Sequence, residues 1–173
     1  MTAPEPWLRG PIPGVPALLQ PAAHAFVMAR EDVDKATFGL DQSCTWLTPG
    51  GSPSIGFHIA HLSGSTDRLL TYARGEGLSD TQRGALLAES TLATSQPSLD
   101  LLRSAWHATV EAALRQLAST DPGSLLDPRE VGRAKLPSNV IGLLFHAAEH
   151  ASRHVGQIIT LARVVRTTTT PPA

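Results

Sequence analysis

The sequence has very little cysteine and an unusually small share of charged residues. Only one of its 173 residues is a cysteine, Cys44, which excludes an internal disulfide and any cysteine-rich zinc motif and favours a reducing, cytoplasmic location. Charged residues make up 17% of the chain, below the roughly 25% of an average soluble domain. The net charge is −1 and no run of Lys or Arg is present, so we expect no nucleic-acid partner.

Long hydrophobic runs are missing as well. The longest apolar stretch, Val140 to Phe145, is interrupted by Gly142 and is far shorter than the roughly 20 residues that cross a bilayer. The segment from Met1 to Trp7 lacks the basic and then apolar pattern of a secretory signal. We therefore expect neither a membrane partner nor export.

What is present is enough apolar material for one folded domain. Hydrophobic residues make up 42% of the chain, which is too many for a disordered protein. Six of the 14 prolines fall within the first 21 residues, so residues 1–19 are predicted to form an extended arm. Residues 20–166 are predicted to form the domain, and the Thr- and Pro-rich residues 167–173 a flexible tail.

Four long segments of this domain show the alternating three- and four-residue spacing of apolar residues that is typical of a helix face. The first predicted helix begins at Pro21, and the second runs from a Ser54 cap to about Arg74. The third follows Ser95 and Pro97 and has apolar positions from Leu99 to Leu117, and the fourth runs from a Ser138 cap to about Arg166. No strand pattern competes with them. The sequence therefore predicts an all-α fold, a four-helix bundle with long crossover connections.

The connections between these helices are less regular. A short helix is predicted over Thr81 to Glu89. The segment from Ser124 to Pro137 lacks helical periodicity, so it is predicted to be either a long ordered crossover loop or a small hairpin.

Histidines are concentrated in two of the predicted helices. His58 and His61 lie on the second, and His146, His150 and His154 lie on the fourth. His150 and His154 are four residues apart, which places them on one helix face one turn apart, the spacing of two imidazoles on one metal ion. The remaining two histidines, His24 and His107, we assign to structural roles.

The pattern does not decide which histidine of the second helix completes a three-imidazole site. Both His58 and His61 border the apolar stripe, and a helical wheel slightly favours His58 as the inward residue. On the fourth helix, His150 and His154 face the edge of the bundle, whereas His146 lies on the rim or supports the site from outside.

Three imidazoles suit a reactive metal site. They are neutral ligands, so a bound divalent ion keeps its full charge, acts as a Lewis acid and leaves a position open for water or a thiol. The segment from His150 to His154 lacks the Glu of H-E-x-x-H metalloproteases. Glu149 lies on the other side of His150, and the catalytic residues are not identified.

Two stretches of the sequence resemble a known family. They are Ser54-Ile-Gly-Phe-His-Ile-Ala-His61-Leu, continued by Asp67-Arg-Leu-Leu-Thr-Tyr72, and Phe145-His-Ala-Ala-Glu-His150-Ala-Ser-Arg-His154-Val-Gly-Gln157. Together they resemble the DinB-like (YfiT-like) family of bacterial metalloproteins over about residues 18–166. The most specific part is the ending His-x-x-x-His-x-Gly-Gln.

The resemblance implies a fold, a ligand set and a chemistry. It implies a four-helix bundle of crossed topology, frequently a homodimer, that holds a divalent ion on His61, His150 and His154, most often zinc or nickel, with iron or manganese as alternatives. Some members of the family look like enzymes that transfer bacillithiol, mycothiol or glutathione to electrophiles, or that isomerise maleylpyruvate with a thiol cofactor. The resemblance thus favours His61 over His58.

Two other functions remain open. The first is a non-catalytic metal-binding protein of the stress response, and the second is a helical interaction domain with structural histidines. Several smaller features have both a structural and a functional interpretation: Gly156 as a helix-packing residue, Gln157 as a solvated residue or a partner of a bound water, Arg153 and Arg133 as exposed residues or carboxylate binders, and Tyr72 and Trp46 as packing residues or pocket walls.

Overall fold

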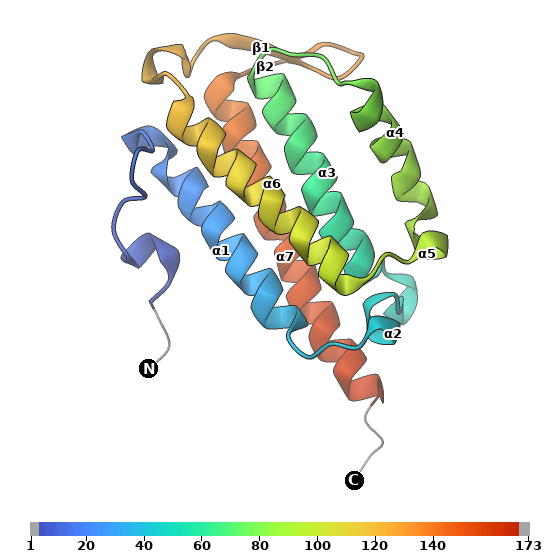
Figure 1. The fold of residues 1–173 in the computed structure, drawn as a ribbon. Coiled ribbons are helices and arrows are strands. Elements are labelled where there is room, and N and C mark those ends of the chain that lie inside the picture. Colours follow the sequence, from blue (N-terminus) through green and yellow to red (C-terminus); the bar gives the residue numbers. More distant parts are fainter. Residues whose placement is uncertain (1–3, 170–173) are drawn as a thin grey trace.

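The computed structural model describes residues 4–169 of the chain, and four long helices dominate it (Figure 1). These helices are α1 (Gln20–Thr37), α3 (Ile55–Ala73), α6 (Leu99–Ser119) and α7 (Val140–Thr169). α7 packs against both α1 and α3, and α6 packs against the same two helices from the other side. The four helices therefore enclose one core, which confirms the predicted all-α four-helix bundle.

The directions of the helices explain why the bundle needs a long connection. α1 and α7 run in the same direction, and α3 and α6 both run in the opposite one (Figure 1). A chain that leaves α3 must therefore return along the bundle before it can begin α6. The returning segment contains α4 (Asp80–Ala88), a 3₁₀ turn (Glu89–Thr91) and α5 (Leu92–Ser95).

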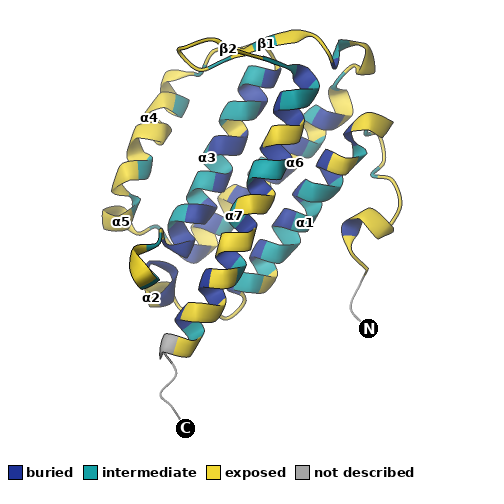
Figure 2. Ribbon diagram, turned by 180° about the vertical axis from the view of Figure 1, so that it is seen from behind, coloured by how far each residue is buried: buried dark blue, intermediate teal, exposed yellow. Residues whose placement is uncertain are grey.

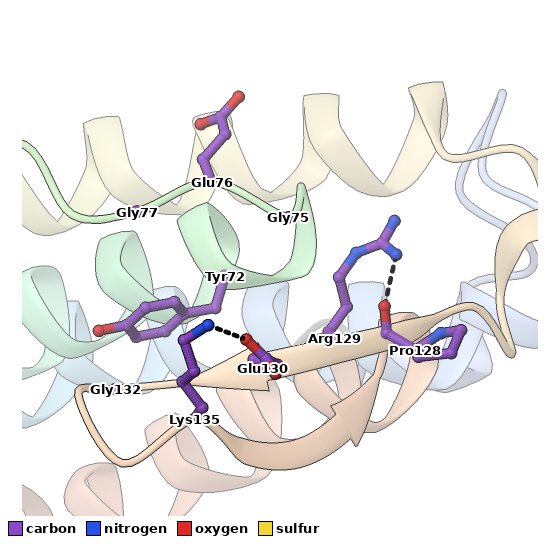
Figure 3. Close-up of a pocket in the computed structure, with 9 residues that line it drawn as sticks. All are labelled: Tyr72, Gly75, Glu76, Gly77, Pro128, Arg129, Glu130, Gly132 and Lys135. Carbon is purple, nitrogen blue, oxygen red and sulfur yellow. Dashed lines mark hydrogen bonds and ion pairs between the residues drawn. The ribbon is translucent and has the colours of Figure 1, made fainter.

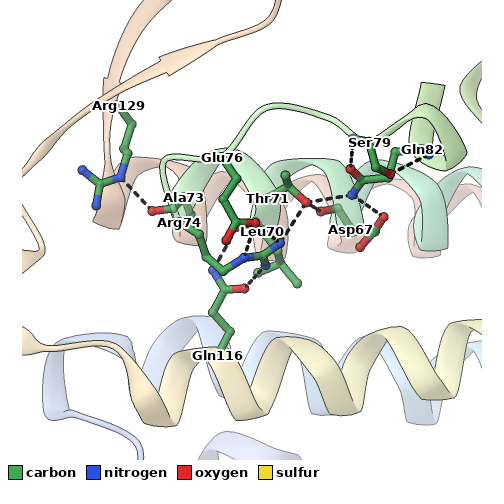
Figure 4. Close-up of polar contacts among 10 residues, drawn as sticks. All are labelled: Asp67, Leu70, Thr71, Ala73, Arg74, Glu76, Ser79, Gln82, Gln116 and Arg129. Carbon is green, nitrogen blue, oxygen red and sulfur yellow. Dashed lines mark hydrogen bonds and ion pairs between the residues drawn. The ribbon is translucent and has the colours of Figure 1, made fainter.

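This returning segment lies on the outside of the bundle. Within α4 and α5, both of which are described in full, no side chain is buried (Figure 2). α4 begins with a capping box, in which the side chains of Ser79 and Gln82 each accept a hydrogen bond from the other residue's backbone N–H. Gln82 also donates to Asp67 and Thr71 on α3 (Figure 4). Polar contacts, rather than a buried apolar face, hold α4 against the bundle.

The connection between α6 and α7 forms a small hairpin at one end of the bundle. After a 3₁₀ turn (Pro122–Ser124), β1 (Pro128–Val131) pairs antiparallel with β2 (Leu136–Asn139). Of the two predicted alternatives for this segment, the hairpin is the one that forms.

The N-terminal arm is predicted to be extended, and within residues 4–19 it contains two 3₁₀ turns (Pro6–Leu8 and Ala17–Leu19). The Arg9 guanidinium contacts the Glu31 carboxylate of α1 through two hydrogen bonds. The Arg9 contact holds the pKa of the Glu31 carboxyl below its usual range. The arm is thus fixed along α1.

The core is formed by side chains from all four long helices. Phe26, Leu62, Trp106, Leu144 and Ile158 have no exposed surface. Their helices turn buried stripes toward one another and exposed stripes outward (Figure 2). This is the arrangement that the apolar spacing predicts.

The helix starts test the predicted caps. Ser54 caps α3 by accepting a hydrogen bond from the Phe57 N–H, as predicted. α6 is capped by Ser98 rather than beginning at Ser95, which lies in α5. For α7 the predicted cap Ser138 is wrong, because Ser138 pairs with Arg129 in the hairpin and the Asn139 side chain accepts from the Gly142 N–H instead.

The C-terminal end of α7 lies beyond the predicted one. α7 continues to Thr169, three residues past Arg166, and residues 170–173 of the predicted tail lie outside the described residues. Among the residues that the structure describes, none of the helices has the length and apolar character that a membrane span requires.

A link at the other end of the bundle positions the start of α3. It contains the short helix α2 (Gln42–Thr45) and a 3₁₀ turn (Pro49–Gly51). The Trp46 ring, which is buried, packs on the first turn of α3 so closely that a Cβ on Gly56 would lie 2.6 Å from it. Trp46 is therefore a packing residue, and its contact fixes the end of α3 that carries His58 and His61.

Candidate metal centre

Three histidines from two helices meet between α3 and α7. The group consists of His61, His150 and His154, and each ring offers one nitrogen that lies within 4.8 Å of those of the other two. The ring centroids are 4.5 Å apart for His150 and His154, 4.7 Å for His61 and His154, and 5.3 Å for His61 and His150. The structure thus brings together the three residues that the family resemblance implied.

The spacing of the nitrogens fits a metal ion. The Nε2 atoms of His61 and His150 face each other at 3.1 Å. Two imidazole nitrogens on one tetrahedral zinc ion, each at about 2.0–2.1 Å from it, lie about 3.3 Å apart. Little movement of the rings would therefore accommodate an ion.

The two rings of α7 are held in the neutral form that metal binding requires. Burial lowers the pKa of His150 to about 4, assisted by the positive charges that His154 and His61 carry when protonated. Burial likewise lowers the pKa of His154 to about 4, with His61 and His58 acting in the same direction. At neutral pH both rings therefore keep a lone pair for an ion.

His58 lies deeper than these three rings and contacts only one of them. It is 6% exposed, and its Nδ1 lies 2.9 Å from Nδ1 of His154. Burial lowers the pKa of His58, so this ring is also kept neutral. One of the two Nδ1 atoms must donate, and when His154 donates, its Nε2 keeps the lone pair that an ion needs. His58 thus lies behind His154, outside the three-histidine group.

A carboxylate from the returning segment reaches the group from the other side. Oε2 of Glu89 lies 2.8 Å from Nδ1 of His61, and Oε1 accepts a hydrogen bond of 2.8 Å from Nη1 of Arg68. The side chains of Glu89 and Arg68 are 15% and 11% exposed, so this ion pair is largely shielded from solvent. Glu89 is the first residue of the 3₁₀ turn between α4 and α5.

The exposed side of α7 carries a separate polar cluster. The Glu149 carboxylate accepts from Arg153 and lies 3.3 Å from Nδ1 of His146. The hydrogen bond from Arg153 lowers the pKa of Glu149. The His146 side chain is 47% exposed and its ring centroid lies 5.7 Å from that of His150, which is the predicted rim position. Arg153 is already paired with Glu149 on its own helix.

Two residues that follow His154 are on the surface. Gly156 and Gln157 are both exposed. A Cβ at Gly156 would meet nothing within 4 Å, so the prediction that this glycine allows close helix packing is wrong. The exposure of Gln157 agrees with the prediction that this residue is solvated.

Tyr72 and Arg133 lie at the far end of α3. Tyr72 lines an open cavity of about 610 Å³ between the end of α3 and the hairpin, together with Arg129 and Lys135 (Figure 3). Arg133 lines a neighbouring cavity that also includes Tyr72. Tyr72 is eleven residues from His61, about 16 Å along the helix, so neither cavity belongs to the three-histidine group.

The other two histidines have structural contacts, as predicted. Nε2 of His24 lies 2.9 Å from the Gly10 carbonyl oxygen and links α1 to the N-terminal arm. Nε2 of His107 lies 2.9 Å from Oδ1 of Asp34 and links α6 to α1.

Glu89 and Arg68 were not identified from the sequence. Arg68 had a usable signal, because it follows His61 by seven residues and so lies on the same face of α3. Glu89 had none, because nothing in the sequence indicates that this part of the long connection folds back onto α3.

A comparison with known protein families agrees with this geometry. The model of the DinB superfamily matches residues 6–158, which include all three histidines. No curated protein matches the chain significantly.

Proposed function

Since the chain belongs to the DinB superfamily, we propose that it binds one divalent metal ion through His61, His150 and His154 and is a metal-dependent enzyme acting on a low-molecular-weight thiol or on water. The observation that supports this best is the meeting of three imidazole nitrogens within 4.8 Å from helices far apart in the chain. Zinc and nickel are the proposed metals, because both accept neutral imidazole ligands.

The donor set determines the kind of chemistry. Three neutral imidazoles leave the double positive charge uncompensated, and an ion so held acts as a Lewis acid that lowers the pKa of a thiol or water at a further position. Burial keeps the rings of His150 and His154 neutral, and Glu89 and His58 contact Nδ1 of His61 and of His154. The sulfur of the thiol, which the family resemblance implies is bacillithiol, mycothiol or glutathione, would form a bond to the electrophilic carbon of the substrate. The leaving group of that carbon would depart with its bonding electrons, and the thiol proton would pass to solvent.

Metal binding is tested directly by elemental analysis of untagged protein. We expect one equivalent of zinc or nickel in the wild type and loss of that metal in His61→Ala, His150→Ala and His154→Ala. A metal-free wild type that takes up no zinc, nickel, iron or manganese on titration would refute the site.

The enzymatic part needs a separate test. The zinc- and nickel-loaded wild type would be assayed with a chloro-dinitrobenzene electrophile and each of the three thiols, with His150→Ala as the matched control. We expect turnover with one thiol that the control lacks. Equal rates for wild type and control with all three thiols would exclude the transferase.

A non-catalytic role in metal binding is the second candidate. It is favoured by the position of the group between α3 and α7, where a bound ion would link two helices of the core. The two functions differ in whether the bound metal ion keeps a coordination position open for an external ligand. Titration of the cobalt-loaded protein with azide or a small thiol should change the visible spectrum if the position is open, and should leave it unchanged if the ion is only structural.

The proposed assembly is a homodimer, as the family resemblance implies. Light scattering coupled to size-exclusion chromatography tests this, and a mass near 18.3 kDa would contradict it.

A further inference from the structure

The strongest unassigned feature of the molecule is the contact between the long returning segment and His61. That segment has no buried side chain in α4 or α5, although Leu92 of α5 packs partly against the core. At Glu89 it nevertheless places a shielded carboxylate on Nδ1 of His61, whose other nitrogen, Nε2, faces His150. Such a carboxylate does more than attach a loop, because it determines which nitrogen of the ring carries the proton.

The hydrogen-bonding chemistry specifies the tautomer. An ionised carboxylate only accepts hydrogen bonds, so Nδ1 of His61 must be the donor to Glu89. A neutral ring that is protonated on Nδ1 has its lone pair on Nε2. That Nε2 is the atom facing Nε2 of His150 at 3.1 Å, on the side where an ion would bind.

A second charge holds the carboxylate in place. Nη1 of Arg68 donates to the other oxygen of Glu89, and the side chains of both residues are at least 85% buried. The carboxylate is therefore held between a guanidinium and an imidazole that both come from α3. The ring of Phe57, also on α3, stacks parallel to that of His61 at a centroid distance of 5.7 Å.

A glycine on α3 leaves the space for this ion pair. A Cβ added to Gly64 would lie 2.8 Å from Nη1 of Arg68 and 2.9 Å from Oε1 of Glu89, closer than real side chains allow. His61, Gly64 and Arg68 follow each other at spacings of three and four residues on one helix face. The absent side chain at position 64 leaves the room in which the ends of the Arg68 and Glu89 side chains meet beside His61.

We propose that Glu89, held by Arg68 in the space left by Gly64, is a positioning residue that keeps His61 protonated on Nδ1 and directs its Nε2 lone pair toward His150 and His154. The expected effect on metal affinity rests on the proposed metal-binding function. The tautomer itself does not, because it can be measured in the metal-free protein.

The first measurement is therefore nuclear magnetic resonance of the ring nitrogens in metal-free protein near neutral pH. We expect the wild-type His61 to carry its proton on Nδ1 and the isosteric Glu89→Gln variant to gain the Nε2-protonated form. A wild-type His61 that is protonated on Nε2, or a tautomer that Glu89→Gln leaves unchanged, would overturn the proposal.

The second measurement is zinc affinity by competition with a chromophoric chelator. Loss of a residue that orients a metal ligand typically weakens binding by about 10- to 100-fold, and we expect this for Glu89→Gln. The matched control is Gln82→Ala, which removes the capping-box bond to Ser79 and the contacts of the same segment to Asp67 and Thr71 without touching His61 (Figure 4). We expect the control to bind zinc as the wild type does.

The outcomes separate the two proposals. Equal affinity for wild type and Glu89→Gln, or equal losses in Glu89→Gln and Gln82→Ala, would mean that Glu89 only attaches the segment. A wild type that binds no metal would instead refute the proposed function, and the tautomer measurement would still decide the role of Glu89.

Discussion

At the scale of single residues, two of the three imidazoles of the group have a partner on their Nδ1 atom. His61 has Glu89, and His154 has His58 at 2.9 Å. We predict that His58→Leu still binds one zinc ion but with lower affinity, by about 10- to 100-fold, because His154 loses the group that orients it. The zinc affinity of the variant is measured by competition with a chromophoric chelator.

The comparison variant for this prediction is His61→Ala. If His58 is a partner of His154 rather than a ligand, His61→Ala must lose far more affinity than His58→Leu. Equal losses, or a greater loss for His58→Leu, would make His58 a ligand and would contradict the arrangement described above.

The sequence predicts the α7 half of this group better than the α3 half. His150 and His154 lie on one helix, so their spacing alone places them together. His58 and His61 both border the apolar stripe of α3, and the choice between them depends on how α3 is rotated against α7. The packing of Trp46 on Gly56 and the arrival of Glu89 beside His61 are tertiary contacts, which periodicity does not report.

At the scale of helices, two glycines that both lie within long helices are expected to respond in opposite ways to substitution by alanine. In α3, a methyl group at Gly56 would meet the buried Trp46 ring at 2.6 Å. We predict that Gly56→Ala lowers the free energy of unfolding by about 1–3 kcal/mol, the usual cost of overpacking. In α7, Gly156 faces open space, so Gly156→Ala should raise it by about 0.5–1 kcal/mol through helix propensity alone.

Urea unfolding followed by circular dichroism measures both changes on the metal-free protein. The pair of variants is informative because the substitution is the same and only the surroundings differ. A stabilising Gly56→Ala would show that the Trp46 ring moves aside freely, and a destabilising Gly156→Ala would show that the outer face of α7 is covered in solution.

The sequence predicts the presence of the four long helices better than it predicts the residues at which they begin and end. The four long helices follow from apolar spacing, and Ser54 caps α3 because an N-cap acts within one turn of chain. The cap of α7 was misplaced by one residue, since hairpin pairing occupies Ser138 and leaves Asn139 as the first free acceptor. The short helices α2 and α5 have too few residues to show any periodicity.

At the scale of the whole molecule, the neutral rings make the stability of the metal-free protein depend on pH. His150 and His154 have pKa values of about 4 when folded, against about 6.5 in an unfolded chain. Between these values the unfolded state binds more protons, so we predict that stability falls as pH decreases from about 6.5 to 4. Above that range these two groups contribute no slope.

Urea unfolding at several pH values, with a chelator present, measures this dependence. The charged and titratable groups around the two rings are those on α7, on α3 and in the returning segment, namely His146, Arg153, His58, His61 and Glu89. We expect a double variant, His150→Gln with His154→Gln, to show a flatter profile. Parallel profiles would assign the pH dependence to other groups.

A bound ion should stabilise the entire fold. Because the proposed ligands come from α3 and α7, binding would require the folded state, and stability should rise with the logarithm of free zinc concentration above the dissociation constant. We predict a rise in melting temperature on adding zinc to the wild type and none for His150→Ala. An equal rise in the melting temperature of the wild type and of His150→Ala would mean that zinc binds at another place on the protein.

The order in which the chain is synthesised gives the three-histidine group a further property. His61 and His150 are 89 residues apart, and α7, which carries two of the three rings, is also the helix that fills the space between α1 and α3. A nascent chain that has not yet released α7 from the ribosome has only one of the three rings and an incomplete core. We therefore expect metal to bind only after α7 has been synthesised and has packed against α3.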